Sequence, residues 1–114
     1  MTYRIEISPT AMADVEKIFL WLKGYSIDEA HRWVRGCYEI MLTLEQFPKR
    51  CAMAAEAQYI NLPVRQLLYK KQYRILFTVI EASEQDPNGQ VQIHRVLRSA
   101  QDRLQDLSQL LGPS

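Results

Sequence analysis

Residues 64–80 read VRQLLYKKQYRILFTVI, and this stretch decides how the rest of the chain folds. It is dense in β-branched and aromatic residues and contains neither Gly nor Pro, a composition that predicts a β-hairpin. In its second arm, residues 73–80, apolar side chains occupy both alternating faces, which is typical of a strand in the middle of a small sheet. We therefore expect the second strand of the hairpin to be a central one.

One charged side chain interrupts this apolar second arm. Because a buried guanidinium requires a partner, we expect Arg74 to reach the rim of the sheet, a carboxylate or an anionic ligand. Arg65, Lys70 and Lys71 lie close by in sequence, and the stretch contains no acidic residue. The local excess of positive charge marks this hairpin as the first place to look for function.

The length and composition indicate an ordinary globular domain. With 114 residues, of which 47% are hydrophobic and 24% charged, we expect a single domain over residues 1–114. The beginning of the chain is too short and too charged for a signal peptide or a membrane span, so the sequence predicts a cytoplasmic protein with no membrane contact. The formal net charge of +1 gives no whole-molecule field of the kind that marks a nucleic-acid binder.

The distribution of charge is more informative than its sum. Half of the fourteen Lys and Arg residues fall in windows 65–74 and 95–103, which hold a single acid, Asp102. If the two windows form neighbouring strands, they make one positive patch on a nearly neutral protein. The candidate binding residues of this patch are Arg65, Lys70, Lys71, Tyr73, Arg74, Arg95 and Arg98.

Cysteine and histidine are too few for a structural metal site. The two Cys and two His residues show no ligand spacing, so we expect neither a metal nor a cofactor. Cys37 falls on an apolar position of a predicted helix, where a buried thiol is the simplest interpretation.

The first half of the chain predicts a strand and a helical hairpin. Residues 3–7 alternate as a half-buried strand, and Ser8 followed by Pro starts a helix that Gly24 ends. Ser26 and the Glu three residues later form a capping box, opening a second helix that Pro48 closes. About two residues join the helices, so they run antiparallel with both apolar stripes on one surface.

The second half predicts the remaining strands. Residues 49–61 have no clear period and are expected to form a loop before the hairpin. The turn-forming residues 86–89 precede a last strand at Val91 to Leu97, and a second capping box at Ser99 to Asp102 starts a C-terminal helix of about residues 100–111. The Leu stripe of this helix packs on the sheet or is left for a partner. The fold class is α+β, β-α-α-β-β-β-α, with the helical hairpin packed on a small, mostly antiparallel sheet.

Three segments in this order carry a family resemblance: Tyr3 to Pro9 with Ala11 and Asp14 shortly after, Tyr73 to Phe77, and Ile93 to Leu97. Over residues 3–102 the chain resembles the RelE/ParE superfamily of bacterial toxins. The resemblance implies the toxin half of a type II toxin–antitoxin, or plasmid stabilisation, system. It also implies a small cognate antitoxin that wraps the toxin and holds it inactive. One branch of the superfamily cleaves messenger RNA on the ribosome, and another inhibits DNA gyrase.

The ribonuclease branch matches only in part. It has an arginine where this chain has Arg74 and basic residues on the preceding strand, where Arg65 matches and Leu67 does not. Its arginine beyond the last strand corresponds to Arg98 with an offset of one position. The C-terminal tyrosine of some members is missing here, because no Tyr follows Tyr73.

The gyrase branch also matches only in part. Its members typically end in a basic stretch of the type H-x-R-R-D. Residues 98–102 of this chain retain only the first basic residue and the Asp of that stretch.

Metal-independent RNA cleavage requires a general base, cations that stabilise the phosphorane, and a general acid. The catalytic candidates are Arg65, Arg74, His94 and Arg98, and His94 has the most suitable ordinary pKa. Structural roles compete with these assignments, since a lone histidine is often a hydrogen-bonded core residue and Arg74 could pair with Glu6, Glu81 or another acid.

We therefore expect a ParE-like toxin that acts by binding a large target such as DNA gyrase. The alternatives are a RelE-like ribosome-dependent endoribonuclease, or a decayed member that only binds its antitoxin. Leu20, Trp21 and Tyr38 lie off the core stripes of the helical hairpin and could form a groove for an antitoxin helix.

Overall fold

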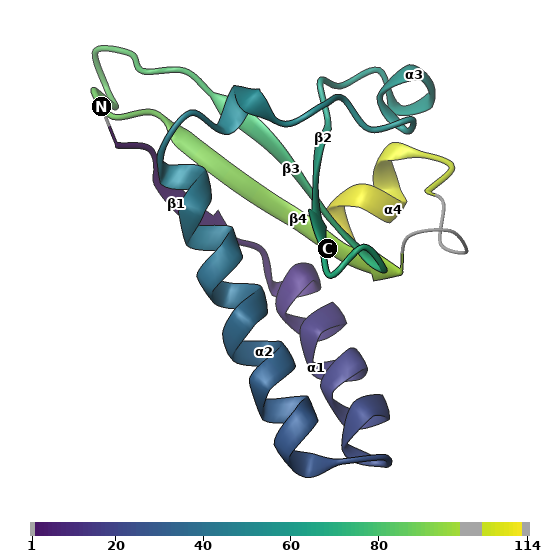
Figure 1. Cartoon of the computed structure of the whole chain (residues 1–114). Helices are drawn as coiled ribbons and strands as arrows, with labels where there is room; N and C mark the ends of the chain where they lie inside the picture. Colours follow the sequence, from purple (N-terminus) through teal and green to yellow (C-terminus); the bar gives the residue numbers. More distant parts are fainter. Residues whose placement is uncertain (1, 99–103, 113–114) are drawn as a thin grey trace.

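A computed structural model describes residues 2–98 and 104–112 of the chain, and Figure 1 shows a long helical hairpin beside a twisted sheet. The element order confirms the expected α+β class. The elements are β1 (Arg4–Ile7), α1 (Pro9–Lys23), α2 (Ile27–Leu42), the 3₁₀ turns η1 (Thr43–Glu45) and η2 (Pro48–Arg50), α3 (Ala57–Ile60), β2 (Arg65–Tyr69), β3 (Tyr73–Ile80), β4 (Gln90–Arg98) and α4 (Leu107–Leu111). Among the described residues, no helix is both long and apolar enough to cross a membrane.

The sheet has the strand order β1-β4-β3-β2, so β3 is central as its two apolar faces predicted. The β2–β3 and β3–β4 pairs are antiparallel, and β1 joins the edge of β4 as a parallel strand. The sheet is therefore mixed, with one parallel pair formed by the first and last strands of the chain. The parallel pair covers only residues 90–93 of β4.

Both predicted helix starts are confirmed by their caps. The Ser8 hydroxyl accepts a hydrogen bond from the Ala11 amide at 3.0 Å, and the Ser26 hydroxyl accepts one from the Glu29 amide at 3.2 Å. The second helix ends earlier than predicted, at Leu42 rather than near Pro48, because the chain continues as the 3₁₀ turn η1. The last apolar residue of its stripe nevertheless stays in the core, since the 3₁₀ turn places Leu44 inward.

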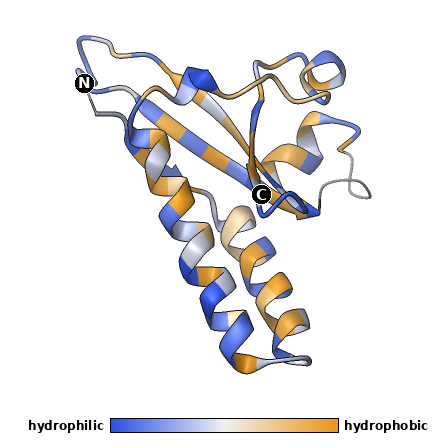
Figure 2. Ribbon diagram, viewed as in Figure 1, coloured by the Kyte–Doolittle hydropathy of each residue, from blue (hydrophilic) through white to orange (hydrophobic). Residues whose placement is uncertain are grey.

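Each face of the sheet has its own buried cluster. The helical hairpin covers one face, where the first cluster contains Trp33, Ile75, Phe77, Ile93 and Val96 among others. The second cluster lies under α3 and α4 and consists of Ala54, Ile60, Val64, Leu76, Leu97, Leu104 and Leu110. Figure 2 shows the resulting alternation of hydrophobic and hydrophilic residues along β4. Successive residues of β3 contribute to opposite clusters, which explains why the strand reads as apolar on both faces.

A β-bulge interrupts β4 where the sequence predicts a regular strand. Leu76 pairs with Arg95 and Phe77 with Ile93, so His94 is the extra residue on the β4 side. The bulge shifts the alternation by one position, and both Ile93 and Val96 therefore face the helical hairpin. A period-2 pattern cannot reveal such a shift, because the bulge depends on the partner strand.

The segment predicted as a loop, residues 49–61, contains two short helical turns, η2 and α3. Residues with left-handed backbone flank them, Phe47 with φ 49° and Asn61 with φ 63°. A four-residue helix such as α3 is too short to show a hydrophobic period, which is why the sequence does not predict it.

The C-terminal helix is shorter than predicted. Within the described residues, α4 begins only after Asp106, whose side chain accepts a hydrogen bond from the Gln109 amide at 3.0 Å. The expectation that the helix extends from about residue 100 is therefore wrong for residues 104–106, which are not helical. The capping box predicted at Ser99 to Asp102 lies outside the described residues. Leu110 is fully buried in the second cluster, so the helix packs back on the sheet.

Candidate functional site

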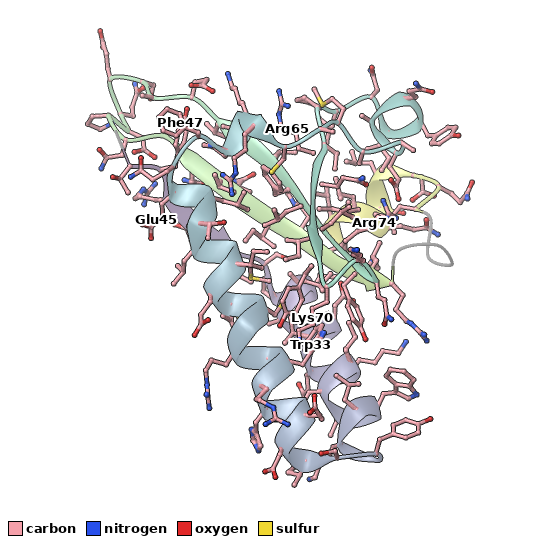
Figure 3. All side chains as sticks on the ribbon, viewed as in Figure 1. Trp33, Glu45, Phe47, Arg65, Lys70 and Arg74 are labelled. Carbon is pink, nitrogen blue, oxygen red and sulfur yellow. The ribbon has the colours of Figure 1, made fainter. Side chains whose placement is uncertain are left out.

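Arg74 lies on β3, two residues before Leu76 of the second cluster, and pairs with a buried acid. Its Nη1 and Nη2 atoms donate to the two carboxylate oxygens of Glu56 at 2.8 and 2.6 Å, and the side chains are only 3% and 0% exposed. Burial is the largest single influence and raises the pKa of Glu56, but the hydrogen bonds and charge of Arg74 together with backbone amide hydrogen bonds outweigh it, so the net pKa is lowered. Of the three partners expected for this guanidinium, the structure contains a carboxylate, and Figure 3 shows Arg74 inside the fold, near α4.

Glu56 also connects the ion pair to the C-terminal segment. Its Oε2 atom accepts a hydrogen bond from the Leu104 amide at 3.4 Å, and Gln66 accepts a hydrogen bond from Arg74 Nη1 at 3.3 Å. The pair therefore joins β2, β3, the turn before α3 and the segment leading to α4. Sequence reasoning did not single out Glu56, because it lies in the stretch without a period.

His94 is buried at the bulge of β4. Its Nε2 atom lies 2.9 Å from the Thr78 hydroxyl, and burial lowers the pKa of the imidazole. Its backbone carbonyl accepts a hydrogen bond from the Ser8 hydroxyl at 3.0 Å. The backbone of His94 thus connects the bulge to the start of α1, and its imidazole connects β4 to β3.

Two further candidates of the patch are occupied by contacts within the fold. Arg65 Nη1 donates to the carbonyl of Cys51 at 2.7 Å and to that of Lys49 at 3.3 Å, which fixes the chain before α3. Tyr73 is buried in the first cluster, where its ring packs edge-on against Trp33 with centroids 5.0 Å apart.

Arg95 joins three elements of the fold. It forms a bidentate pair with Asp14 of α1, with distances of 2.7 Å from Nε to Oδ2 and 3.0 Å from Nη2 to Oδ1. Its Nη1 atom donates to the Gln109 carbonyl of α4 at 2.6 Å. Asp14 also accepts a hydrogen bond from the Val96 amide at 2.9 Å, so it covers the edge of β4 beyond the end of β1.

The remaining patch residues, Lys70, Lys71 and Arg98, are exposed. The strand register places all three at one end of the sheet, because Tyr73 pairs both with the last residue of β2 and with Arg98. Lys70 and Lys71 occupy the turn with left-handed φ values of 51° and 61°. The structure thus brings three of the seven predicted binding residues together at the surface and uses the other four inside the fold.

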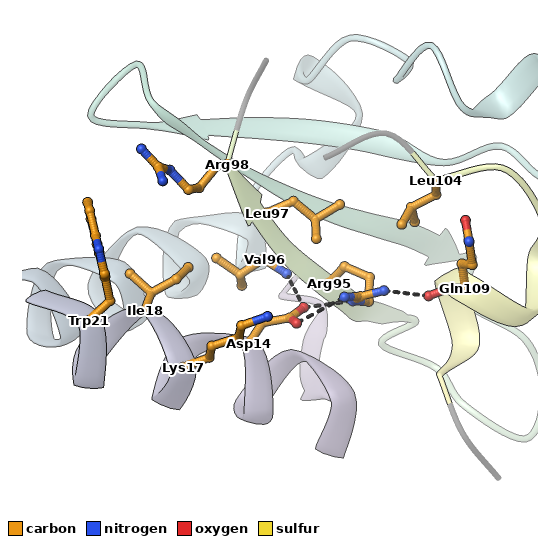
Figure 4. A pocket seen from close by; sticks show the side chains of 10 residues that line it. All are labelled: Asp14, Lys17, Ile18, Trp21, Arg95, Val96, Leu97, Arg98, Leu104 and Gln109. Atoms are coloured by element: carbon orange, nitrogen blue, oxygen red, sulfur yellow. Dashed lines mark hydrogen bonds and ion pairs between the residues drawn. The ribbon is translucent and has the colours of Figure 1, made fainter. Parts of the chain in front are cut away.

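A cavity of about 600 Å³ lies beside Arg98, between α1, β4 and the C-terminal segment (Figure 4). The Arg95–Asp14 pair forms its floor, and Trp21 and Lys17 of α1 stand on one side. The Arg98 guanidinium lies 4.8 Å from the centroid of the Trp21 ring. Sequence reasoning assigned Trp21 to the antitoxin groove and did not connect it with Arg98, because no local pattern relates the end of α1 to the end of β4.

A second hollow of about 620 Å³ runs along the other side of α1, between the two helices of the hairpin. Its apolar lining comes from Met12, Val15, Phe19, Val34 and Tyr38, and its rim from Glu16, His31 and Arg35. Of the three groove residues expected from the sequence, only Tyr38 lines this hollow. Trp21 lines the cavity beside β4 instead, and Leu20 is exposed without lining either.

The described cysteines, histidines and acids form no metal-binding group. Among residues 2–98 and 104–112, no three His, Cys, Asp or Glu side chains gather in a way that could hold a metal ion. Cys37 is buried as expected, and its burial raises the pKa of the thiol to about 12, so the thiol stays protonated.

Residues 5–103 match the family described as ParE toxin of type II toxin-antitoxin system, parDE. The chain belongs to this family. A solved structure described as the chromosomal ParDE TA system from P. aeruginosa has the same fold, with a TM-score of 0.66 and 19% sequence identity over 85% of this chain and 96% of that chain. No curated protein sequence matches the chain.

Membership of the ParE toxin family confirms the resemblance to the RelE/ParE superfamily and its ParE-like side. The protein is a type II toxin of the ParE kind, and the family implies a cognate antitoxin as its partner. The match ends at residue 103, so α4 lies outside the matched residues.

Proposed function

We propose that this ParE toxin acts in the bacterial cytoplasm and arrests growth by binding a large protein target such as DNA gyrase. The observation that carries the proposal is that three of the four nuclease candidates are engaged in contacts within the fold, and only Arg98 is exposed. Arg74 is bound to Glu56, Arg65 to two backbone carbonyls, and His94 is buried beside Thr78. Cleavage of RNA requires a base that can remove the proton of the 2′-hydroxyl within reach of the substrate, whereas binding to a target requires only a complementary surface.

The antitoxin, in our proposal, places an amphipathic helix in the hollow between α1 and α2. This hollow is lined by apolar side chains of both helices and bordered by charged side chains of both signs, which suits a helix that carries its apolar anchors on one face. Tyr38→Glu should weaken antitoxin binding because it adds a charge to the apolar lining. Tyr59→Glu, at an exposed aromatic on α3, is the matched control.

The first experiment asks whether the toxin is active and whether its partner relieves it. The chain is expressed alone from an inducible promoter in bacteria, and then together with the small protein encoded by the neighbouring gene. We expect growth arrest in the first case and growth in the second. Normal growth at high soluble expression, with antitoxin binding retained, would favour the decayed member that only binds its antitoxin.

The second experiment identifies the mode of action. Purified toxin is added to a supercoiling assay with purified gyrase, and transcript 5′ ends are mapped after induction in cells. We expect inhibition of gyrase and intact ribosome-bound transcripts. Codon-phased cleavage with gyrase unaffected would instead establish the RelE-like ribosome-dependent endoribonuclease, and the candidates Arg65, Arg74, His94 and Arg98 would return as catalytic residues.

A further inference from the structure

A cluster of exposed aromatic and cationic side chains lies where α1 ends beside the last strand. Trp21 is 45% exposed and Tyr25 is 77% exposed, and their rings meet edge-on with centroids 5.5 Å apart. Arg98 lies over the Trp21 ring at 4.8 Å. We call Trp21, Tyr25 and Arg98 the aromatic–cation cluster.

The fold does not require this cluster. The buried stripe of α1 consists of Ala11, Val15 and Ile18, which pack on the sheet without help from Trp21. Large exposed aromatics lose favourable burial for as long as they face water, and Trp, Tyr and Arg are the residues that contribute most to protein–protein binding. The cavity of about 600 Å³ beside Trp21 offers a place for an anchoring side chain of a partner.

The side of the cluster that faces the end of the sheet is positively charged, whereas Asp28 and Glu29 follow Tyr25 in the first turn of α2. Lys17 lines the same cavity, and Lys70 and Lys71 are exposed at the sheet end that also carries Arg98. The one acid that lines the cavity, Asp14, is already bound by Arg95 and by the Val96 amide. The described surface around the cluster therefore presents cations that no acid of this cavity neutralises.

We propose that the aromatic–cation cluster, with Lys17, Lys70 and Lys71, is the surface that contacts the toxin's target protein, and that the target presents acidic side chains to it. This inference rests on the proposed function and names the surface that performs it. It leaves the α1–α2 hollow free for the antitoxin, because Phe19 and Tyr38 line that hollow while Trp21 lines the other side of α1.

Charge and ring geometry favour an acidic protein over other occupants. A second copy of the chain, related by a twofold axis through this surface, would bring like charges together, which opposes association. Single-stranded nucleic acid stacks its bases on open aromatic faces, but Arg98 already lies over the Trp21 ring and Tyr25 meets it edge-on.

The test compares cluster variants with matched surface variants of the full chain. The cluster variants are Trp21→Ala and Arg98→Glu, and the controls are Tyr59→Ala on α3 and Arg32→Glu on α2, which are exposed and line neither hollow. Each is measured for inhibition of purified gyrase, for growth arrest and for binding to the co-encoded antitoxin. Thermal melting verifies that every variant is folded.

We expect each cluster variant to lose gyrase inhibition by about tenfold or more, as for a central interface residue, while antitoxin binding stays within about twofold. Wild-type binding to gyrase should also weaken with added salt, since the contact includes exposed charges. The controls should behave as wild type in every assay.

The outcomes separate this inference from the proposed function. If wild type inhibits gyrase and the folded cluster variants inhibit it equally, the surface assignment is wrong and the function stands. If wild type arrests growth without affecting gyrase, the gyrase target is wrong, and the surface assignment then survives only if the cluster variants lose growth arrest. Binding of wild type, but not of Arg98→Glu, to a single-stranded oligonucleotide would overturn the acidic protein as the occupant.

Discussion

Arg74 shows how one buried charge can serve the fold at a position that looks functional in the sequence. Its guanidinium and the Glu56 carboxylate satisfy each other beside the second cluster, and the Leu104 amide adds a further bond to the carboxylate. Removing either partner strands the other charge in a dry environment, whereas replacing both by apolar residues removes the problem. The main contribution of the pair is therefore to specify that β2, β3, the turn before α3 and the segment leading to α4 come together, rather than to raise the stability.

The ion pair leads to a stability prediction. Arg74→Ala should lower the free energy of unfolding by about 3–5 kcal/mol, because the Glu56 carboxylate is left buried without its counter-ion. The double variant Arg74→Met with Glu56→Leu should recover most of that loss. Urea denaturation followed by circular dichroism measures both, and a loss below about 1 kcal/mol for Arg74→Ala would mean that the pair is dispensable.

His94 leads to a prediction about pH. Burial lowers the pKa of the imidazole in the folded protein below its ordinary value of 6.5. As the pH falls below 6.5, the unfolded chain therefore binds a proton at this histidine more readily than the folded protein does. Stability is therefore complete above about pH 6.5 and falls as the pH drops below it, with a slope of at most about 1.4 kcal/mol per pH unit for one proton. The lowered pKa of Glu56 affects the stability only as the pH falls below the ordinary value of this carboxyl, 4.5, which is outside the pH range of His94.

The measurement is urea denaturation of wild type at several pH values between 7.5 and 5.5. His94→Gln should remove most of the decline in stability toward low pH, while His31→Gln, at an exposed position, serves as the control and should keep it. A decline of the same slope in the His94 variant would assign the proton to another group.

At the level of elements, the contact between α2 and β2 depends on a residue without a side chain. The Tyr69 hydroxyl donates to the Trp33 carbonyl at 2.9 Å and lies directly against Gly36, where a Cβ atom would overlap the hydroxyl. A glycine inside a helix normally lowers stability, since it has more freedom in the unfolded chain. Here it allows the helix and the strand to come close together.

Gly36→Ala should therefore destabilise the protein, by about 1–3 kcal/mol, although alanine is the better helix former. In a Tyr69→Phe background the overlapping hydroxyl is absent, and the same substitution should become much less harmful or slightly favourable. Denaturant unfolding of the four proteins in this double-mutant cycle measures the coupling. Equal effects of Gly36→Ala in both backgrounds would show that the hydroxyl is not the cause.

The elements that local chemistry specifies were predictable. The caps at Ser8 and Ser26 and the alternation of residues 73–80 gave α1, the start of α2 and the central strand. The bulge at His94 and the pairing of Arg74 with Glu56 were not predictable, because each depends on residues distant in sequence. For the same reason, the sequence predicted a positive patch on neighbouring strands but could not tell its buried members from its exposed ones.

At the scale of the whole molecule, the C-terminal segment closes the second face of the sheet. Leu104 and Leu110 complete the second cluster, Arg95 holds the Gln109 carbonyl, and the Thr10 hydroxyl donates to the Leu111 carbonyl at 3.4 Å. This segment lies beyond the residues that match the ParE family. It is nevertheless part of the core of this protein.

The importance of the segment can be tested within one helix. Leu110→Ala should lower the free energy of unfolding by about 2–5 kcal/mol, because Leu110 is fully buried. Leu107→Ala, at a side chain that is 42% exposed on the same helix, should change it by about 0.5 kcal/mol or less. Thermal unfolding of both variants measures the difference, and similar values for both would show that α4 is not docked on the sheet in solution.

The parallel pairing of β1 with β4 has a consequence for the order in which the strands can pair during synthesis and folding. β4 is made last among the strands but lies between β1 and β3, so the first strand has no partner strand in the sheet until residues 90–93 have left the ribosome. Contacts so distant in sequence form late in folding, after local hairpins. A product that ends before residue 90 keeps the sequences of both hairpins but lacks the strand that joins them, and no shortened chain of this kind can assemble the toxin fold.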